Sequence, residues 1–263
     1  MRMSGIDLLS RKLGIEKANI RLSYQIVGKA LILKELPTFV EDEKVFADAI
    51  RSSLRLWSVY SLKSIEGEVR KPNTTLLSGI GCEIEHHEDG IIYRFDPSKL
   101  MFSKGNKKER HRLSNVVGKD EIVLDMFAGI GYFSIPLSLK ARTVYAAEIN
   151  PDAFHYLLVN KRLNGAMNLK PMLCDSSKID KLDFADRIIM GHFSSLKYLQ
   201  HALRYLKRRG EIHIHLLVRR GESENVSSIL MKVEGVKDVA FLKVKEFSPR
   251  IDHMVFDVSV KKN

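Results

Sequence analysis

The stretch from Glu121 to Ser134, EIVLDMFAGIGYFS, constrains the fold of this chain more than any other. Its first half is apolar and rich in β-branched residues, as in a buried strand, and it ends in the acid Asp125. The turn that follows contains Gly129 and Gly131, which let the backbone approach a ligand closely, before a segment that can become helical. The stretch therefore predicts the strand–loop–helix opening of a nucleotide-binding α/β unit.

A second predicted strand, Thr143–Glu148, ends in a carboxylate and runs into Asn150-Pro151, which begins another helix. An acid at this place can accept both hydroxyl groups of a ribose. A dinucleotide dehydrogenase would have a third glycine where this chain has Ser134. We therefore expect S-adenosylmethionine (SAM) rather than NAD, and a dehydrogenase is disfavoured.

Strands and helices alternate regularly from residue 116 onward and close in two strands, at residues 239–247 and 254–260. This layout predicts an α/β fold, with a Rossmann-like class I SAM-dependent transferase domain over residues 116–263. Within it, a helix is expected over residues 196–209, with a stop at Gly210. Residues 1–115 indicate a smaller α+β domain, with a helix over residues 1–20 and a basic turn over residues 68–74.

The charge balance favours a polyanionic partner. Lys and Arg number 43 against 32 Asp and Glu, which gives a net charge of +11 and a pI near 9.5. Such an excess is typical of proteins that neutralise the phosphates of RNA or DNA.

The two cysteines, Cys82 and Cys174, are far apart and form no CxxC pair, which disfavours a zinc site or a disulfide framework. His86 and His87 are adjacent on a predicted strand and point to opposite faces, and His213 and His215 lack a third ligand nearby. We therefore expect no metal. Without a membrane-length apolar run or a signal-peptide core, we expect a cytoplasmic protein with no membrane partner.

Several short segments of the chain form a recurrent set of motifs: Tyr93-x-Phe95-Asp96, Phe102-Ser103, Glu109-Arg110-x-Arg112, Asp125 to Gly131, Glu148 to Pro151, Ala185 to Met190 and Val244-Lys245-x-Phe247-Ser248-Pro249-x-x-x-His253. Together these segments resemble the archaeal and eukaryotic tRNA guanosine-37 modification group. One branch of this group methylates N1 of guanosine-37. The other transfers a 3-amino-3-carboxypropyl group from SAM to 4-demethylwyosine at that position, a tRNA modification step in wybutosine biosynthesis.

Two stretches separate the branches. Amino-methyltransferases place Asn or Asp followed by Pro after the fourth strand, whereas this chain has Met190-Gly191-His192-Phe193-Ser194-Ser195. That loop, and the run Met101-Phe102-Ser103-Lys104-Gly105-Asn106, are similar to the aminocarboxypropyl branch. The resemblance implies a SAM-dependent aminocarboxypropyltransferase that acts on tRNA(Phe) and releases 5′-methylthioadenosine. A guanosine-37 N1-methyltransferase and a non-catalytic SAM- or RNA-binding module are the alternatives.

The resemblance also implies a set of site residues. SAM would be bound by Ser103, Arg110, Asp125, Phe127, Gly129, Gly131, Glu148, Ile149, Asp175 and Ser176, with Glu148 at the ribose and Asp175 at the adenine. Asp175 is alternatively a helix cap. His192 is the candidate base for the proton that leaves the acceptor carbon, or else a loop residue that shapes the base pocket.

The predicted phosphate contacts to the tRNA anticodon loop are Arg70, Lys71, Lys104, Lys107 and Lys108. The N-terminal region is expected to help hold the tRNA, and the protein is expected to act as a monomer.

Overall fold

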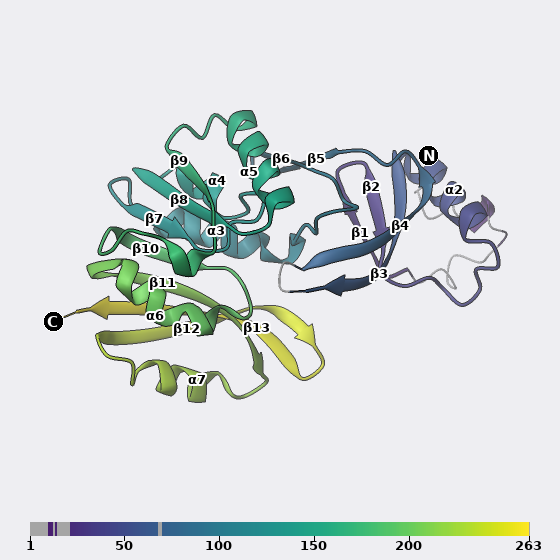
Figure 1. Ribbon diagram of the computed structural model, residues 1–263. Helices are drawn as coiled ribbons and strands as arrows, with labels where there is room; N and C mark the ends of the chain where they lie inside the picture. The colour runs from purple at the N-terminus through teal and green to yellow at the C-terminus, as the bar shows by residue number, and fades with distance from the viewer. Residues whose placement is uncertain (1–9, 13, 15–21, 68–69, 263) are drawn as a thin grey trace. The chain divides into compact units, whose positions relative to one another are not determined.

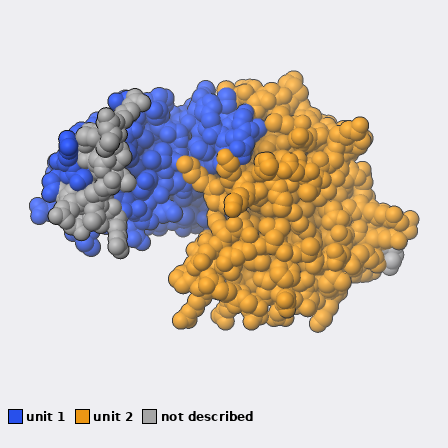
Figure 2. Space-filling model, turned by 180° about the vertical axis from the view of Figure 1, so that it is seen from behind, with its two compact units in different colours: residues 1–102 blue, residues 103–263 orange. Residues whose placement is uncertain are grey.

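The computed structural model describes residues 10–12, 14, 22–67 and 70–262. The chain divides into two compact units, residues 1–102 and 103–263, which Figure 2 colours separately. The boundary expected at residue 115 differs from this division because α3 (Lys107–Val116) packs within the second unit. There Arg112 on α3 donates hydrogen bonds to Asp257 on the last strand.

The first unit is built on a four-stranded sheet in the order β1-β2-β3-β4. Its elements are β1 (Tyr24–Val27), β2 (Ala30–Leu33), α2 (Glu43–Leu54), β3 (Ser58–Glu66) and β4 (Lys71–Gly79), followed by the hairpin of β5 (Ile84–Glu88) and β6 (Ile91–Phe95). The helix α2 begins after Asp42, whose carboxylate accepts two backbone N–H groups, and it connects the parallel strands β2 and β3. Its apolar face packs with both strands to form the core of this unit.

Strand β4 corrects the basic turn expected over residues 68–74. It pairs antiparallel with β3 from Glu66↔Lys71 to Ser58↔Gly79. Pro72 and Asn73 are poor strand formers, and for that reason the sequence indicates a turn. The strand forms by pairing with β3, and Pro72 is tolerated because β4 is an edge strand, where the missing N–H of proline need not interrupt a ladder. The helix expected over residues 1–20 falls mostly outside the described residues, of which 10–12 are helical.

The second unit contains a seven-stranded sheet in the order β12-β13-β11-β10-β7-β8-β9 (Figure 1). Its strands are β7 (Ile122–Asp125), β8 (Thr143–Glu148), β9 (Leu169–Leu173), β10 (Ala185–Met190), β11 (Leu206–Arg219), β12 (Val236–Ser248) and β13 (Ile251–Lys261). Neighbouring strands from β11 to β9 are parallel, and β13 and β12 run antiparallel to their neighbours. The Rossmann-like α/β fold expected from the sequence is confirmed.

Helices cover both faces of this sheet. Besides α3 they are α4 (Ser134–Ser138), α5 (Pro151–Leu163), α6 (Leu199–Tyr205) and α7 (Ser223–Leu230), with 3-10 turns η2 (Lys104–Asn106), η3 (Ser176–Lys178) and η4 (Ser195–Tyr198). α6 and α7 share one apolar core with Leu124, Ile188 and Ile212 of the sheet. α3 lies on the other face, where its Arg112 and His213 of β11 both hydrogen-bond Asp257. β7 is flanked by β8 and by β10, so the carboxyl ends of β7 and β10 form the switch point where ligands bind in such sheets.

The helix expected over residues 196–209 is shorter than the pattern indicates. It consists of η4 and α6, and β11 already begins at Leu206. The cause is the pairing of β11 with β10: a Cβ on Gly210 would lie 2.3 Å from the backbone oxygen of Asp186. Gly210 therefore permits a close approach of two strands instead of ending a helix.

Candidate active site

The loop after β7 has a backbone that only glycine readily adopts at two positions. Gly129 and Gly131 have φ angles of +57° and +98°. A Cβ on Gly131 would lie 2.6 Å from the Cδ1 atom of Ile135, so a side chain there would also collide with α4. The loop is thereby held close against the start of the helix, at the carboxyl end of β7.

Glu148, at the end of β8, binds this loop directly. Its Oε2 atom accepts a hydrogen bond from the backbone N–H of Gly129 at 2.6 Å, and Oε1 accepts one from Asn150 at 2.7 Å. Burial raises the pKa of Glu148, and these backbone donors oppose the shift. Each carboxylate oxygen keeps a second lone pair, so the group can still accept a pair of ribose hydroxyls. The neighbouring Ile149 is 57% exposed and offers an apolar surface beside the carboxylate.

Asp125 faces the interior. It is fully buried, and its carboxylate accepts hydrogen bonds from the backbone N–H of Phe127 at 3.2 Å and from the Oγ atom of Ser134 at 2.6 Å. Burial raises the pKa of Asp125 to about 6, against the effect of these two donors. Ser134, the residue that breaks the dinucleotide fingerprint, therefore braces the glycine loop through Asp125.

The unfolding free energy of Asp125→Asn, relative to that of the wild type, is expected to be higher at pH 7 than at pH 4. An acid with a raised folded pKa binds its proton more tightly when folded, so the folded state loses stability as the pH rises from about 4 to about 6. Asparagine keeps the acceptor for Phe127 and does not titrate. A shift of roughly two pH units corresponds to up to about 3 kcal/mol of unfolding free energy between the two pH values.

Urea unfolding of both proteins at pH 4 and pH 7 measures this difference. Asp238→Asn, at an exposed position, is the matched control and should show no such trend. A difference between wild type and Asp125→Asn that does not change with pH would contradict the raised pKa.

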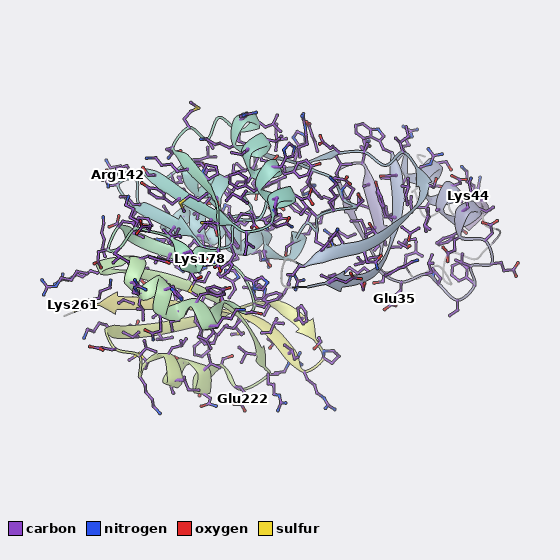
Figure 3. The ribbon with its side chains drawn as sticks, in the orientation of Figure 1. Glu35, Lys44, Arg142, Lys178, Glu222 and Lys261 are labelled. Carbon is purple, nitrogen blue, oxygen red and sulfur yellow. The ribbon has the colours of Figure 1, made fainter. Side chains whose placement is uncertain are left out.

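The end of β9 lies beside Glu148. The backbone N–H of Cys174 donates to the backbone oxygen of Glu148 at 3.0 Å, which places Asp175 and Ser176 next to the ribose candidate. Asp175 caps η3 by accepting from the N–H of Ser177 at 2.9 Å, and this bond lowers its pKa. The cap is thus a role that this side chain fills in the structure. The turn ends at Lys178, which is labelled in Figure 3.

The loop after β10 contacts the glycine loop. The rings of Phe127 and His192 lie 5.6 Å apart, and Phe127 also packs edge-on against Tyr198 at 5.3 Å. The Nδ1 atom of His192 accepts a hydrogen bond from the backbone N–H of Ser194 at 3.2 Å. A neutral ring with this bond carries its proton on Nε2, so His192 can accept a further proton only at Nδ1, after release of Ser194.

Gly191 in this loop packs against the ring of Phe133. A Cβ at this position would lie 3.0 Å from the Cε2 atom of Phe133 and 3.3 Å from Cδ2. Any side chain at position 191 therefore requires the Phe133 ring to move. The glycine at position 191, where the methyltransferases have Asn or Asp, therefore lets the Phe133 ring pack close to the loop backbone.

Ser103 and Arg110 are brought together at the start of α3. Arg110 is 3% exposed, and its Nη1 atom donates to the backbone oxygen of Ser103 at 3.0 Å. The turn between them passes close to Lys245, because a Cβ on Gly105 would lie 2.7 Å from its Cδ atom. Arg110 therefore supports the backbone of the predicted cofactor-arm region.

The predicted phosphate contacts lie on both units. Lys104, Lys107 and Lys108 are exposed on η2 and α3 of the second unit. Arg70 and Lys71 are exposed at the start of β4 in the first unit.

A chain of hydrogen-bonded polar groups connects α3 with the sheet, and the sequence motifs do not predict it. It runs through Glu109, Arg112, Asp257, His213, Arg187 and Glu121. Arg187 donates to Nε2 of His213 at 2.6 Å, so Nδ1 of His213 carries the proton donated to Asp257 at 2.5 Å. The sequence motifs contain Glu109, Arg112 and Arg187, but they do not show which side chains these residues meet.

Within the described ranges, no group of three or more His, Cys, Asp or Glu side chains is placed to hold a metal ion. Cys82 and Cys174 are free thiols. No helix in the described part of the chain is long and apolar enough to cross a membrane.

Residues 84–240 match the family described as the TRM5/TYW2 methyltransferase domain. A tRNA(Phe) (4-demethylwyosine(37)-C(7)) aminocarboxypropyltransferase from Methanocaldococcus jannaschii is 33% identical over 258 residues, which cover 92% of this chain and 99% of that protein. The tRNA (guanine(37)-N(1))-methyltransferase Trm5b from Pyrococcus abyssi is 34% identical over 253 residues, with coverages of 90% and 74%. The crystal structure of P. horikoshii TYW2 in complex with MeSAdo has a TM-score of 0.84 and 29% identity, covering 98% of this chain and 100% of the other.

Proposed function

The chain belongs to the TRM5/TYW2 family, and we propose that it transfers the 3-amino-3-carboxypropyl group of SAM to C7 of 4-demethylwyosine at position 37 of tRNA(Phe). The aminocarboxypropyltransferase of M. jannaschii supports this branch because it aligns over almost its whole length. The Trm5b relative is equally similar in identity but extends beyond the aligned region. Identity alone therefore does not separate the branches, and the site must do so.

The observation that carries the proposal is the loop at Gly191. A base-nitrogen methyltransferase of this group would present an Asn or Asp side chain here. In this chain position 191 is a glycine, and a Cβ there would lie 3.0 Å from the Phe133 ring, so a side chain would need that ring to shift by a few tenths of an ångström. The loop is thus built without the amide that would hold a base nitrogen beside a methyl group.

The residues at the carboxyl ends of β7, β8 and β9 fit SAM as the group donor. Gly129 and Gly131 leave no side chain between backbone and ligand, and Glu148 retains acceptor capacity for the ribose. Ile149 and Asp175 adjoin it on the adenine side. The turn from Ser103 to Arg110 would border the amino acid arm. Asp125 and Phe127 shape the loop.

The proposed reaction forms one carbon–carbon bond and breaks one carbon–sulfur bond. C7 of the base attacks the γ-carbon of the methionine moiety, and the sulfonium leaves as neutral 5′-methylthioadenosine. The proton on C7 must depart, and His192 is the proposed acceptor, through Nδ1 after Ser194 is released. The protein selects the γ-carbon over the methyl carbon by orienting the two substrates.

The proposed macromolecular substrate is the anticodon loop of tRNA, bound by a monomer in the cytoplasm. The net charge of +11 and the exposed Lys104, Lys107 and Lys108 support phosphate binding. Arg70 and Lys71 are proposed to add contacts from the first unit. The modified base has to leave its stack to reach a buried reaction centre.

Incubation with SAM and tRNA(Phe) that carries 4-demethylwyosine is expected to release 5′-methylthioadenosine in equal amount to the modified nucleoside. Mass spectrometry of both products measures this. S-adenosylhomocysteine as the product would mean methyl transfer, and guanosine-37 tRNA would then be the substrate to test. SAM binding with neither product would support the non-catalytic alternative.

The same assay tests His192. His192→Ala should lower turnover by about a hundredfold or more, within the range for loss of a general base, while the SAM dissociation constant stays unchanged. His155→Ala, an exposed histidine on α5, is the control. Near-normal turnover of His192→Ala would remove the base role and leave the loop-shaping role.

A further inference from the structure

A row of aromatic rings lies behind the loop Gly191–Ser195. Ring centroids are 5.2 Å apart for Phe133 and His215, 5.1 Å for His215 and His253, and 4.9 Å for His253 and Phe193. Phe247 closes the row at 5.5 Å from Phe193. The row thus runs from Phe133, after the glycine loop, through His215 of β11 and His253 of β13 to Phe193 of the loop Gly191–Ser195, and it ends at Phe247 of β12.

Two contacts anchor the loop to these strands. The ring of Phe193 packs edge-on against His253, with an interplanar angle of 80°. The Oγ atom of Ser195 donates to the backbone oxygen of His215 at 3.4 Å. Within the loop, the backbone N–H groups of Ser194 and Ser195 donate to His192, and the two anchors tie this turn to β11 and β13.

The two histidines fix each other. Nδ1 of His215 and Nε2 of His253 are 3.0 Å apart, and both side chains are 0% exposed. Their remaining nitrogens, Nε2 of His215 and Nδ1 of His253, have no hydrogen-bond partner among the described residues. The bond between the rings is therefore the only one that either imidazole makes in the described structure, and removal of one ring leaves the other buried without a partner.

Both rings are neutral near pH 7. Burial lowers the pKa of His253 to about 4, with Lys245 adding to the shift, and burial lowers the pKa of His215 well below its ordinary value. A bond between two neutral imidazoles needs one donor and one acceptor, and the pair satisfies this in either tautomer arrangement. The bond therefore holds throughout the neutral pH range.

We propose that His253, oriented by its hydrogen bond to His215, is a positioning residue that holds Phe193 and thereby places the loop Gly191–Ser195 against the bound base. This inference rests on the proposed function. It assigns a role to His253, the last residue of the Ser248-Pro249-x-x-x-His253 motif, which the SAM site does not explain. It acts on the chemical step because a substitution far from the reacting atoms that misplaces them by about 1 Å can cost about a hundredfold in rate.

Two substitutions at position 253 separate the bond from the ring. His253→Phe keeps a ring against Phe193 and removes the hydrogen bond to His215. His253→Gln keeps an amide that reaches the place of Nε2 and removes the ring. His155→Phe, at an exposed histidine that packs on Tyr156, is the matched control. We expect kcat to fall at least about tenfold in both variants, because His253→Phe loses the orienting bond and His253→Gln loses the ring that holds Phe193, with KM for SAM within about twofold of wild type.

The decisive comparison repeats His253→Phe in a Phe193→Leu background. If His253 acts through Phe193, the second substitution removes the effect of the first, so the two losses in kcat are non-additive. Turnover is normalised to the SAM-binding fraction from isothermal titration, which corrects for any unfolded protein. Multiplicative losses, an unchanged kcat in His253→Phe, or a loss that appears only as weaker SAM binding would each overturn the proposal.

The ratio of variant to wild-type turnover is measured for whichever modified nucleoside the wild type forms in the tRNA. Release of S-adenosylhomocysteine by the wild type would refute the proposed function and leave the positioning role open to the same comparison. The two failures are therefore distinguishable.

Discussion

Replacing Glu148 by glutamine is expected to weaken SAM binding by at least about a hundredfold. The carboxylate accepts backbone N–H groups on both oxygens, from Gly129 and from Asn150. An amide has only one oxygen, so its NH2 group must face one of these donors. The loss of one charge-assisted bond to the loop and one to the ribose amounts to roughly 3–6 kcal/mol, at about 1.5–3 kcal/mol each.

Isothermal titration with SAM measures the change in dissociation constant. Glu234→Gln, at an exposed position after α7, is the matched control and should bind as the wild type does. A dissociation constant for Glu148→Gln within about fivefold of wild type, in folded protein, would refute the assignment of Glu148 to the ribose.

Replacing Asp257 by asparagine is expected to destabilise the second unit by about 2–4 kcal/mol at pH 7. Arg112 donates to both oxygens of Asp257, at 2.6 and 2.9 Å, and His213 donates to one of them. Removal of one partner of a fully buried pair costs about 3–5 kcal/mol, and the side chains here are 27% and 21% exposed, which reduces the effect.

The pH dependence follows from the pKa of Asp257. Burial alone would raise it, but the hydrogen bonds from His213 and Arg112 outweigh burial and hold the pKa below its ordinary value. A lowered folded pKa stabilises the protein above the unfolded pKa and less as the pH falls. The difference between wild type and Asp257→Asn should therefore shrink below about pH 4.

Urea unfolding at pH 7 and at pH 3 measures both effects. The control is Glu246→Gln, another acid-to-amide change, in an ion pair with Arg220 whose side chains are 52% and 56% exposed. Such exposed pairs contribute about 1 kcal/mol or less. Equal destabilisation by both substitutions would contradict a structural role for the pair of Arg112 and Asp257.

Local patterns alone predicted the two strands and the glycine loop that form the proposed cofactor site. Apolar runs followed by Asp125 and Glu148 predict β7 and β8, and Gly129 and Gly131 predict the loop between them, because strand periodicity and positive φ angles are properties of neighbouring residues. The motifs also predict the family and the absence of an Asn-Pro loop at Gly191. The placement of Glu148 against Gly129 then follows from parallel strand order.

The sequence alone did not predict the edge strand β4 or the point where β11 begins, and the tertiary structure was needed to find both. Pro72 and Asn73 indicate a turn, yet β4 forms by pairing with β3 at the edge of its sheet. Gly210 indicates a helix stop, yet it lies within β11 at a close approach to Asp186. In both cases pairing with a neighbouring strand of the sheet, β3 for β4 and β10 for β11, outweighs the local preference of the chain.

Pairings between remote side chains were decided by tertiary structure alone. Arg112 and Asp257 are 145 positions apart, and His215 and His253 are 38 apart. Both pairs depend on β13 lying antiparallel beside β11 in one register, since a slip of one residue would turn Asp257 and His253 to the opposite face. The sequence specifies which side chains are available for such contacts, and the register of the sheet determines which of them meet.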